Sequence, residues 1–317
     1  MLKAFTMDDL ELVIIGAGAA GLTAGIYAVR SGLKTVILEE KLAGGTIADA
    51  PFVENYPGFA SVSGTELAQK IVAHAKGVGV TVNELEPVVS LDLKGEKKRV
   101  QTQKAVYEAK AVIIASGSHY RQLGVPGEKE FRGRGVSYCG ICDGPFFRGK
   151  RVLVVGGGNS AAMTTLYLAG IASEIKIVHR RAAFRCEEAL TQSLKNTKNV
   201  EILWNTEIKE IQGDRIVQKV ILLDKKTGET EELPVNGIFV QVGEDPNSQI
   251  AKEAGIALDA DDYIVVDAQQ RTNLAGVYAA GDVTNRPIKQ VGTAVGQGIA
   301  AALDAYGFIR RPYYHEG

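Results

Sequence analysis

The sequence predicts an α/β protein of two similar domains, each built around a parallel sheet, with the second domain inserted into the first. A glycine-rich hexapeptide occurs twice, as Gly16-Ala17-Gly18-Ala19-Ala20-Gly21 and as Gly156-Gly157-Gly158-Asn159-Ser160-Ala161. Each hexapeptide follows an apolar run (12–15 and 152–155) and opens an alanine-rich stretch. Strand, tight glycine turn and helix in that order form the dinucleotide-binding unit of a Rossmann-like domain.

The first unit is expected to contain strand 11–15, helix 19–31, strand 34–39, a strand-rich stretch 80–110 and a strand 111–115 that ends at Gly117. Apolar runs bounded by glycine fit parallel strands that are covered on both faces. The polar turn at 94–98 indicates a hairpin or meander within the strand-rich stretch.

The second unit repeats this plan. It is expected to contain strand 151–155, helix 159–170, strand 174–178, a strand-rich stretch 200–235 with a polar turn at 225–229, and a strand 238–242 that ends at Gly243. Two copies of one plan, each with parallel strands, helices and a hairpin or meander, predict two Rossmann-like, three-layer ββα domains.

The order of these elements predicts the domain boundaries. Residues 1–117 and 247–317 are expected to form the outer domain, and residues 118–246 the inserted one. The linkers are expected near 118–126 and 243–247, because both stretches are rich in glycine, proline or polar residues.

Composition narrows the classes of function. The 317 residues suffice for two domains with separate cores. A net charge of −1 favours neither nucleic acid nor an anionic membrane as partner. No apolar run approaches the roughly 18 residues of a membrane span. Residues 1–10 carry no apolar segment of a signal peptide, and three cysteines argue against a disulfide framework, so a cytoplasmic protein is expected.

The residue that closes the second strand of each unit distinguishes the two nucleotides. Glu39 and His179 each lie 18 residues after the hexapeptide, and His179 is followed by Arg180, Arg181 and, further on, Arg185. A carboxylate accepts hydrogen bonds from ribose hydroxyls and repels a 2′-phosphate, whereas guanidinium groups bind a phosphate. The first unit is therefore expected to bind a nucleotide with a free ribose, and the second to bind NADPH.

The hexapeptides are expected to hold the pyrophosphates, because glycines allow close approach of the backbone and a helix start offers free N–H groups. The expected contacts are, in the first unit, Gly16, Gly18, Ala19, Ala20 and Gly21, and, in the second, Gly156, Gly158, Asn159, Ser160 and Ala161.

Cys139 and Cys142 enclose only Gly140 and Ile141, so a disulfide between them closes a very small loop. Such a pair is redox-active or forms half of a metal site. A zinc site would need a second pair, and the chain offers only Cys186 and four scattered histidines, so no metal is predicted. Asp143 follows directly, where a carboxyl could deliver a proton to a departing thiolate.

These motifs together resemble the low-molecular-weight thioredoxin reductases, and the likeness covers nearly the whole chain. It is carried by the first hexapeptide, Val53-Glu54-Asn55-Tyr56-Pro57-Gly58, Gly133-Arg134-Gly135, Cys139-Gly-Ile-Cys-Asp143-Gly144, the second hexapeptide, His179-Arg-Arg181 with Arg185, and Tyr278-Ala-Ala-Gly281-Asp282-Val283.

The resemblance implies FAD in the outer domain, NADPH in the inserted domain, a homodimer, and thioredoxin or a thioredoxin-like protein as partner. It implies that Cys142 faces the flavin and that Cys139 exchanges with the protein disulfide. The further FAD contacts that it implies are Glu39, Gly45, Thr46, Asn55, Gly117, Asp282, Lys289 and Gln290.

The chain departs from the pattern of that family in three respects. Thr46 stands where many relatives have a glutamine, and Met163 and Thr164 stand where relatives often carry two acids. Pro145 precedes Phe146-Phe147, which is expected to reshape the groove that grips thioredoxin.

The leading hypothesis is an NADPH-dependent thioredoxin reductase. A flavin-dependent dithiol oxidase is an alternative, although it would have no use for Arg180 and Arg181. A second alternative is the disulfide-reductase half of a peroxidase-reducing system, which normally carries an additional N-terminal domain. A third, a flavoprotein redox sensor, would signal through the state of the dithiol.

Overall fold

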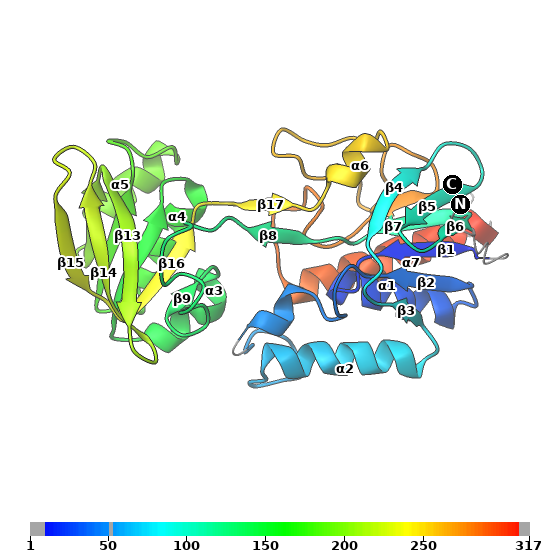
Figure 1. Ribbon diagram of the computed structural model, residues 1–317, viewed down its shortest axis with the longest axis horizontal. Helices are drawn as coiled ribbons and strands as arrows, with labels where there is room; N and C mark the ends of the chain where they lie inside the picture. Colours follow the sequence, from blue (N-terminus) through cyan, green and yellow to red (C-terminus); the bar gives the residue numbers. More distant parts are fainter. Residues whose placement is uncertain (1–9, 51–52, 311–317) are drawn as a thin grey trace. The chain divides into compact units, whose positions relative to one another are not determined.

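The computed structural model describes residues 10–50 and 53–310. The chain divides into two compact units, the first comprising Met1–His119 with Asp245–Gly317 and the second comprising Tyr120–Glu244 (Figure 1). The second unit is thus one continuous segment that interrupts the first. The parts of the sequence analysis that concern residues 1–9 and 311–317 fall outside the described residues.

The first unit is built on a five-stranded parallel sheet in the order β18-β7-β1-β2-β3. Its strands are β1 (Leu12–Ile15), β2 (Thr35–Leu38), β3 (Thr81–Asn83), β7 (Ala111–Ile114) and β18 (Val277–Ala279). The chain leaves β1 for β2 on one side and returns to β7 on the other. The carboxyl end of β1 therefore lies where the strand order reverses, which is the place where such sheets bind ligands.

Alternate residues of β1 enter two cores, one on each face of the sheet. Leu12 and Ile14 pack on the helical side, and Val13 and Ile15 pack on the side of the meander. The helices on the first face are α1 (Ala19–Arg30), α2 (Gly64–Gly77) and α7 (Val291–Arg310). The meander on the second face consists of β4 (Val88–Asp92), β5 (Lys98–Thr102) and β6 (Val106–Ala109).

The second unit repeats these layers around the parallel sheet β12-β11-β10-β16-β9. Its strands are β9 (Val136–Ser137), β10 (Arg151–Gly156), β11 (Glu174–His179), β12 (Val200–Trp204) and β16 (Gly237–Gln241). One face carries α4 (Asn159–Ala169) and α5 (Glu188–Asn196), and the other carries the meander β13 (Thr206–Gly213), β14 (Val217–Asp224) and β15 (Thr230–Pro234). Two short helices, α3 (Gly140–Asp143) and η2 (Gly144–Phe147), follow β9.

The predicted fold class, two three-layer ββα units with one inserted into the other, is confirmed. Helices α2 and α7 were not predicted, although Ser63 is an N-cap residue whose side chain accepts a hydrogen bond from the Glu66 amide at 3.1 Å. The stretches expected to link the domains contain paired strands, β8 (Ser118–Tyr120) and β17 (Glu244–Pro246). Among the helices of the described chain, none is long and apolar enough to cross a membrane.

Candidate functional site

The first glycine hexapeptide forms a tight turn that leaves backbone donors uncovered. Gly16 has a φ of +103°, and a Cβ there would lie 2.3 Å from the carbonyl oxygen of Ala115. Helix α1 begins at Ala19, and its N-cap residue, Gly18, supplies no side-chain cap. The first N–H groups of α1 are thus free of side-chain partners, as a pyrophosphate of FAD would require.

The glycine turn and the first N–H groups of α1 together form a cradle for a pyrophosphate, and Glu39 fixes its edge. One carboxylate oxygen accepts a hydrogen bond from the amide of Ala17, within the hexapeptide, at 2.7 Å. The other oxygen accepts from the amide of Lys41 at 2.8 Å. Each oxygen keeps a second lone pair for a ribose hydroxyl, so the residues present fit the adenosine half of FAD.

The structure brings together two residues that the resemblance assigned to the flavin. The side-chain amide of Asn55 donates to Oε1 of Gln290 at 3.2 Å, across 235 residues of sequence. Lys289 lies beside Gln290, but its ammonium group donates to the carbonyl oxygens of Asp282, at 3.0 Å, and of Thr284. Lys289 is therefore engaged in fixing the loop that carries Asp282.

Gln297 was missed by sequence reasoning. Its Oε1 accepts from the amide of Gly281 at 2.7 Å and from the hydroxyl of Thr284 at 3.3 Å, and so it ties helix α7 to the loop after β18. Gly281 has a φ of +81°. A lone glutamine within a helix carries no signal that distinguishes it from a surface residue.

The remaining predicted contacts of the first unit lie on loops. Gly45, with a φ of +70°, leaves no room for a Cβ, which would lie 2.8 Å from the Cα of Gly18. Thr46 is exposed at the start of η1 (Thr46–Asp49). Gly117 has a φ of +69°, and its carbonyl accepts from the amide of Asn247 at 3.0 Å.

The second hexapeptide forms a comparable cradle. A Cβ on Gly156 would lie 2.3 Å from the carbonyl oxygen of Gln241, whereas a Cβ on Gly158 would meet nothing within 4 Å. Gly158 precedes α4 without a side-chain cap. The turn is thus closed toward the sheet and open at Gly158, where a pyrophosphate could approach.

The two polar residues of this hexapeptide differ in their surroundings. Asn159 exchanges two hydrogen bonds with Glu187, accepting from its amide at 3.0 Å and donating to its carboxylate at 3.1 Å. Ser160 is exposed in the first turn of α4, ahead of the fully buried Ala161. Asn159 therefore fixes the loop after β11 over the cradle.

That loop presents three cations. Arg180, Arg181 and Arg185 are exposed, and their side chains form no ion pair or hydrogen bond with the residues that the structure describes. The amide of Arg185 donates to the carbonyl of Gly157 at 2.7 Å, which holds the loop beside the hexapeptide. Three uncompensated guanidinium groups at one cradle provide the charge that a 2′-phosphate needs.

His179 lies inside the unit and not among these exposed side chains. Its exposed fraction is 6%, and a Cβ on Gly157 would lie 2.3 Å from its ring. The ring centroid is 5.5 Å from that of Phe184 and 6.4 Å from that of Trp204. Burial lowers the pKa of His179; a hydrogen bond with the backbone of Ala183 opposes this shift, and the nearby arginines add to it.

The glycine at position 157 follows from this packing. The corresponding residue of the first hexapeptide is Ala17, and its partner at the strand end, Glu39, approaches through a hydrogen bond. The imidazole ring of His179 instead occupies the place of a side chain at Gly157. Within the described residues, Nε2 of His179 has no hydrogen-bond partner.

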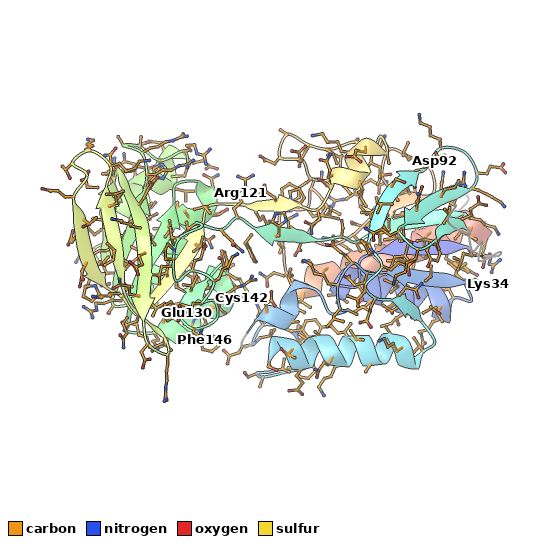
Figure 2. All side chains as sticks on the ribbon, in the orientation of Figure 1. Lys34, Asp92, Arg121, Glu130, Cys142 and Phe146 are labelled. Atoms are coloured by element: carbon orange, nitrogen blue, oxygen red, sulfur yellow. A yellow bond between two sulfur atoms is a disulfide. The ribbon has the colours of Figure 1, made fainter. Side chains whose placement is uncertain are left out.

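Cys139 and Cys142 form a disulfide at the start of α3 (Figure 2). The amide of Cys142 donates to the sulfur of Cys139 at 3.2 Å, so Cys139 acts as the N-cap of this short helix. Ile141 between them is 60% exposed. A hydrogen bond to Sγ favours a thiolate on Cys139 once the disulfide is reduced.

Asp143 is positioned by a residue that the sequence did not single out. The hydroxyl of Ser137 donates to Oδ2 of Asp143 at 2.6 Å and accepts from the amide of Cys139 at 3.1 Å. Burial raises the pKa of Asp143, and the Ser137 hydrogen bond opposes that shift in part. A carboxyl with a raised pKa is suited to donate a proton, and this one directly follows Cys142 in the chain.

Cys186 and Phe147 pack within the second unit. Cys186 is free and partly buried, with its sulfur 3.3 Å from the hydroxyl of Thr191. Phe147 packs edge-on against Phe239 at a centroid distance of 5.2 Å. Phe147 therefore belongs to the packing of the unit. Within residues 10–50 and 53–310 there is no group of three or more acidic, histidine or cysteine side chains that could hold a metal.

Two dinucleotide cradles and a redox dithiol, carried by two parallel-sheet units, define the class of this protein. The chain belongs to the pyridine nucleotide-disulphide oxidoreductase family, whose model matches residues 10–298.

Within this family the chain is similar to thioredoxin reductases. It is 41% identical over 300 residues to the thioredoxin reductase of Bacillus subtilis (strain 168), covering 94% of each chain. It is 38% identical over 302 residues to that of Treponema pallidum (strain Nichols), covering 95% of this chain and 97% of the other. The crystal structure of thioredoxin reductase from Streptococcus pyogenes MGAS5005 matches with a TM-score of 0.91 at 39% identity, covering 95% of this chain and 98% of the other.

Proposed function

We propose that this protein is an NADPH-dependent thioredoxin reductase, which reduces the disulfide of thioredoxin or of a thioredoxin-like protein through Cys139 and Cys142. The observation that carries the proposal is the Cys139–Cys142 disulfide in the same unit as a nucleotide cradle with three unpaired arginines. The likeness to thioredoxin reductases over nearly the whole chain supports it.

The cofactors are FAD and NADPH, as in the family. We assign FAD to the first unit because its cradle pairs free backbone donors with the carboxylate of Glu39. We assign NADPH to the second because its cradle is flanked by Arg180, Arg181 and Arg185. FAD, held by the first hexapeptide and Glu39, would supply the redox chemistry that links NADPH to the protein disulfide.

The dithiol then reduces the partner in two exchange steps. The Cys139 thiolate, favoured by the amide of Cys142, attacks one sulfur of the partner disulfide; a mixed disulfide forms and one partner thiolate leaves. Cys142 attacks the Cys139 sulfur, which restores the internal disulfide and releases the second partner thiolate. Asp143, whose pKa burial raises, supplies a proton to a departing thiolate.

The arginines weigh against the main alternative. A flavin-dependent dithiol oxidase takes its electrons from a thiol and delivers them to oxygen, so it needs no cation at a second nucleotide cradle. Arg180, Arg181 and Arg185 carry three positive charges without a partner among the described residues. Keeping three such charges adjacent is unfavourable without an anionic ligand.

We also propose a homodimer located in the cytoplasm. Exposed apolar side chains on α1 and α7, Tyr27, Leu303 and Phe308, offer a surface that a second copy could cover. The free thiol of Cys186 suits a reducing compartment. Sedimentation of the purified protein and fractionation of the native cells test these two points.

Steady-state assays with a bacterial thioredoxin test the function. With FAD-loaded protein, NADPH oxidation should require thioredoxin and should generate two thiols for each NADPH consumed, whereas Cys142→Ser should be inactive. Equal NADPH oxidation without thioredoxin, accompanied by oxygen uptake, would support the oxidase. Slow turnover with every thioredoxin offered would support a redox sensor.

A further inference from the structure

The segment that carries the dithiol leaves the sheet of the second unit after β9, and a side chain at the end of β16 binds it there. Nε2 of Gln241 donates to the carbonyl oxygen of Tyr138, the residue before Cys139, at 2.8 Å. The hydroxyl of Thr164 on α4 donates to Oε1 of Gln241 at 3.3 Å. The amide of Gln241 thus joins the dithiol segment to α4.

The same segment contacts Thr164 directly. A Cβ on Gly140, between the two cysteines, would lie 2.5 Å from the Cγ2 methyl of Thr164, so the backbone of α3 rests on this side chain. Thr164 therefore uses its methyl group to support Gly140 and its hydroxyl group to hold Gln241.

Tyr138 itself is fixed at its other end. Its hydroxyl donates to the buried carboxylate of Glu128 at 2.8 Å, and its ring stacks on Tyr120 at a centroid distance of 5.2 Å. With its ring held in this way, the carbonyl of Tyr138 has little freedom apart from rotation of its peptide plane. The hydrogen bond from Gln241 fixes that peptide plane, and with it the direction of the backbone from Tyr138 into Cys139.

Gln241 also borders the second cradle. It is the last residue of β16 and pairs in register with Gly156, whose missing Cβ would meet the Gln241 carbonyl at 2.3 Å. The backbone of Gln241 thus shapes the nucleotide turn while its side chain holds the dithiol segment.

We propose that Gln241, supported by Thr164, is a positioning residue that holds Cys139 and Cys142 in the geometry that joins their sulfurs. The hydrogen bonds that it makes are present with the disulfide closed. Their loss should lower the effective concentration of one thiol at the other and make the disulfide easier to reduce. The inference rests on the proposed function only in taking this pair as the redox couple.

Equilibration of the FAD-loaded protein with reduced and oxidised dithiothreitol tests this role without NADPH or thioredoxin. Reduction of the disulfide consumes one reduced dithiothreitol and yields one oxidised dithiothreitol and the protein dithiol. Alkylation traps the reduced cysteines, and mass spectrometry gives the fraction of chains in which Cys139 and Cys142 are reduced. This fraction and the ratio of reduced to oxidised dithiothreitol give the equilibrium constant.

Two variants break the network at different points. Nε2 of Gln241 also donates to the carbonyl oxygen of Val240 at 3.1 Å, so Gln241→Glu keeps the acceptor for Thr164 and removes the donor to both carbonyls, whereas Thr164→Val keeps the methyl group and removes the hydroxyl. The loss of a net hydrogen bond should raise the equilibrium constant for reduction roughly two- to tenfold, in Thr164→Val at the lower end of that range. In Gln241→Glu the rise should be at least as large, because the carboxylate also repels the carbonyl oxygens of Tyr138 and Val240.

Thr165→Val is the matched control, because the Thr165 hydroxyl donates only within α4, to the carbonyl of Ala161 at 2.8 Å. Its equilibrium constant should equal that of the parent protein. An unchanged constant in both test variants, or an equal shift in Thr165→Val, would overturn the proposal. If Gln241→Glu does not fold, Thr164→Val decides. If the parent protein does not reduce thioredoxin, the proposed function is refuted, but the equilibrium constants measured here still test the role of Gln241.

Discussion

Replacing Arg180 and Arg181 together by alanine should weaken the use of NADPH and leave the use of NADH nearly unchanged. Both side chains are exposed and unpaired among the described residues, so their removal strands no buried partner. The backbone should keep its position, because the carbonyl of Arg181 accepts from the amide of Asn205 at 3.2 Å and this bond does not depend on the side chain.

The size of the effect follows from the kind of contact that is lost. A hydrogen bond to a charged group contributes about 1.5–3 kcal/mol, and exposure to solvent and salt places these contacts at the lower end of that range. One lost contact of about 1.5 kcal/mol corresponds to roughly a tenfold rise in the KM for NADPH. Two independent contacts give at most about a hundredfold.

Steady-state kinetics with both nucleotides provide the assay, and Arg215→Ala, an exposed arginine of the same unit, provides the control. The KM for NADPH in the double variant should also depend less on salt, because fewer charges face the phosphate. Equal loss of NADPH and NADH activity would show that these arginines support the fold, and the assignment of the 2′-phosphate site would be withdrawn.

Three further predictions concern the flavin edge and the dithiol. Glu39→Arg should weaken FAD retention, because a cation cannot accept the hydrogen bonds that the carboxylate accepts from the amide of Ala17 and from the ribose. Full flavin occupancy after purification would contradict the assignment. Cys139→Ser should leave a Cys142 thiolate that gives a long-wavelength absorbance with the flavin, and the same band in Cys142→Ser alone would reverse their roles. Asp143→Asn should slow thioredoxin reduction. The variant should also become more thermally stable than the parent protein as the pH rises, because only the parent loses stability over that pH range. The pKa of Asp143 is raised by folding, so the parent protein binds more protons than its unfolded chain between the two pKa values and loses stability as the pH increases through that window; melting curves at several pH values measure the difference.

Local patterns in the sequence account for most of the fold. Continuous apolar runs before two glycine turns identify β1 and β10, because buried parallel strands are apolar on both faces. Helix α7 was missed because its sequence is interrupted by glycines and is otherwise rich in alanine, so its periodicity is weak. It is stabilised by packing against α1, with Ala301, Ala302 and Ala305 buried in the shared core, which depends on distant parts of the chain.

The site shows the same division between local and distant effects. Spacing alone singled out Cys139, Cys142 and Asp143, because they are neighbours in sequence. Ser137 and Gln241 were missed, because a hydroxyl or an amide becomes a positioning group only when the fold brings its partner within hydrogen-bond distance. The buried ring of His179 was likewise inaccessible to spacing arguments, although the additional glycine at 157 was a signal of close packing.

Anaerobic titration with NADPH tests most directly whether electrons pass from NADPH through the dithiol. The FAD-loaded parent protein should take up two electron pairs per chain, one for the flavin and one for the Cys139–Cys142 disulfide, and both cysteines should then react with an alkylating reagent. The Cys139→Ser variant should take up one pair. Uptake of a single pair by the parent protein, with Cys139 and Cys142 still resistant to alkylation, would contradict the proposed route.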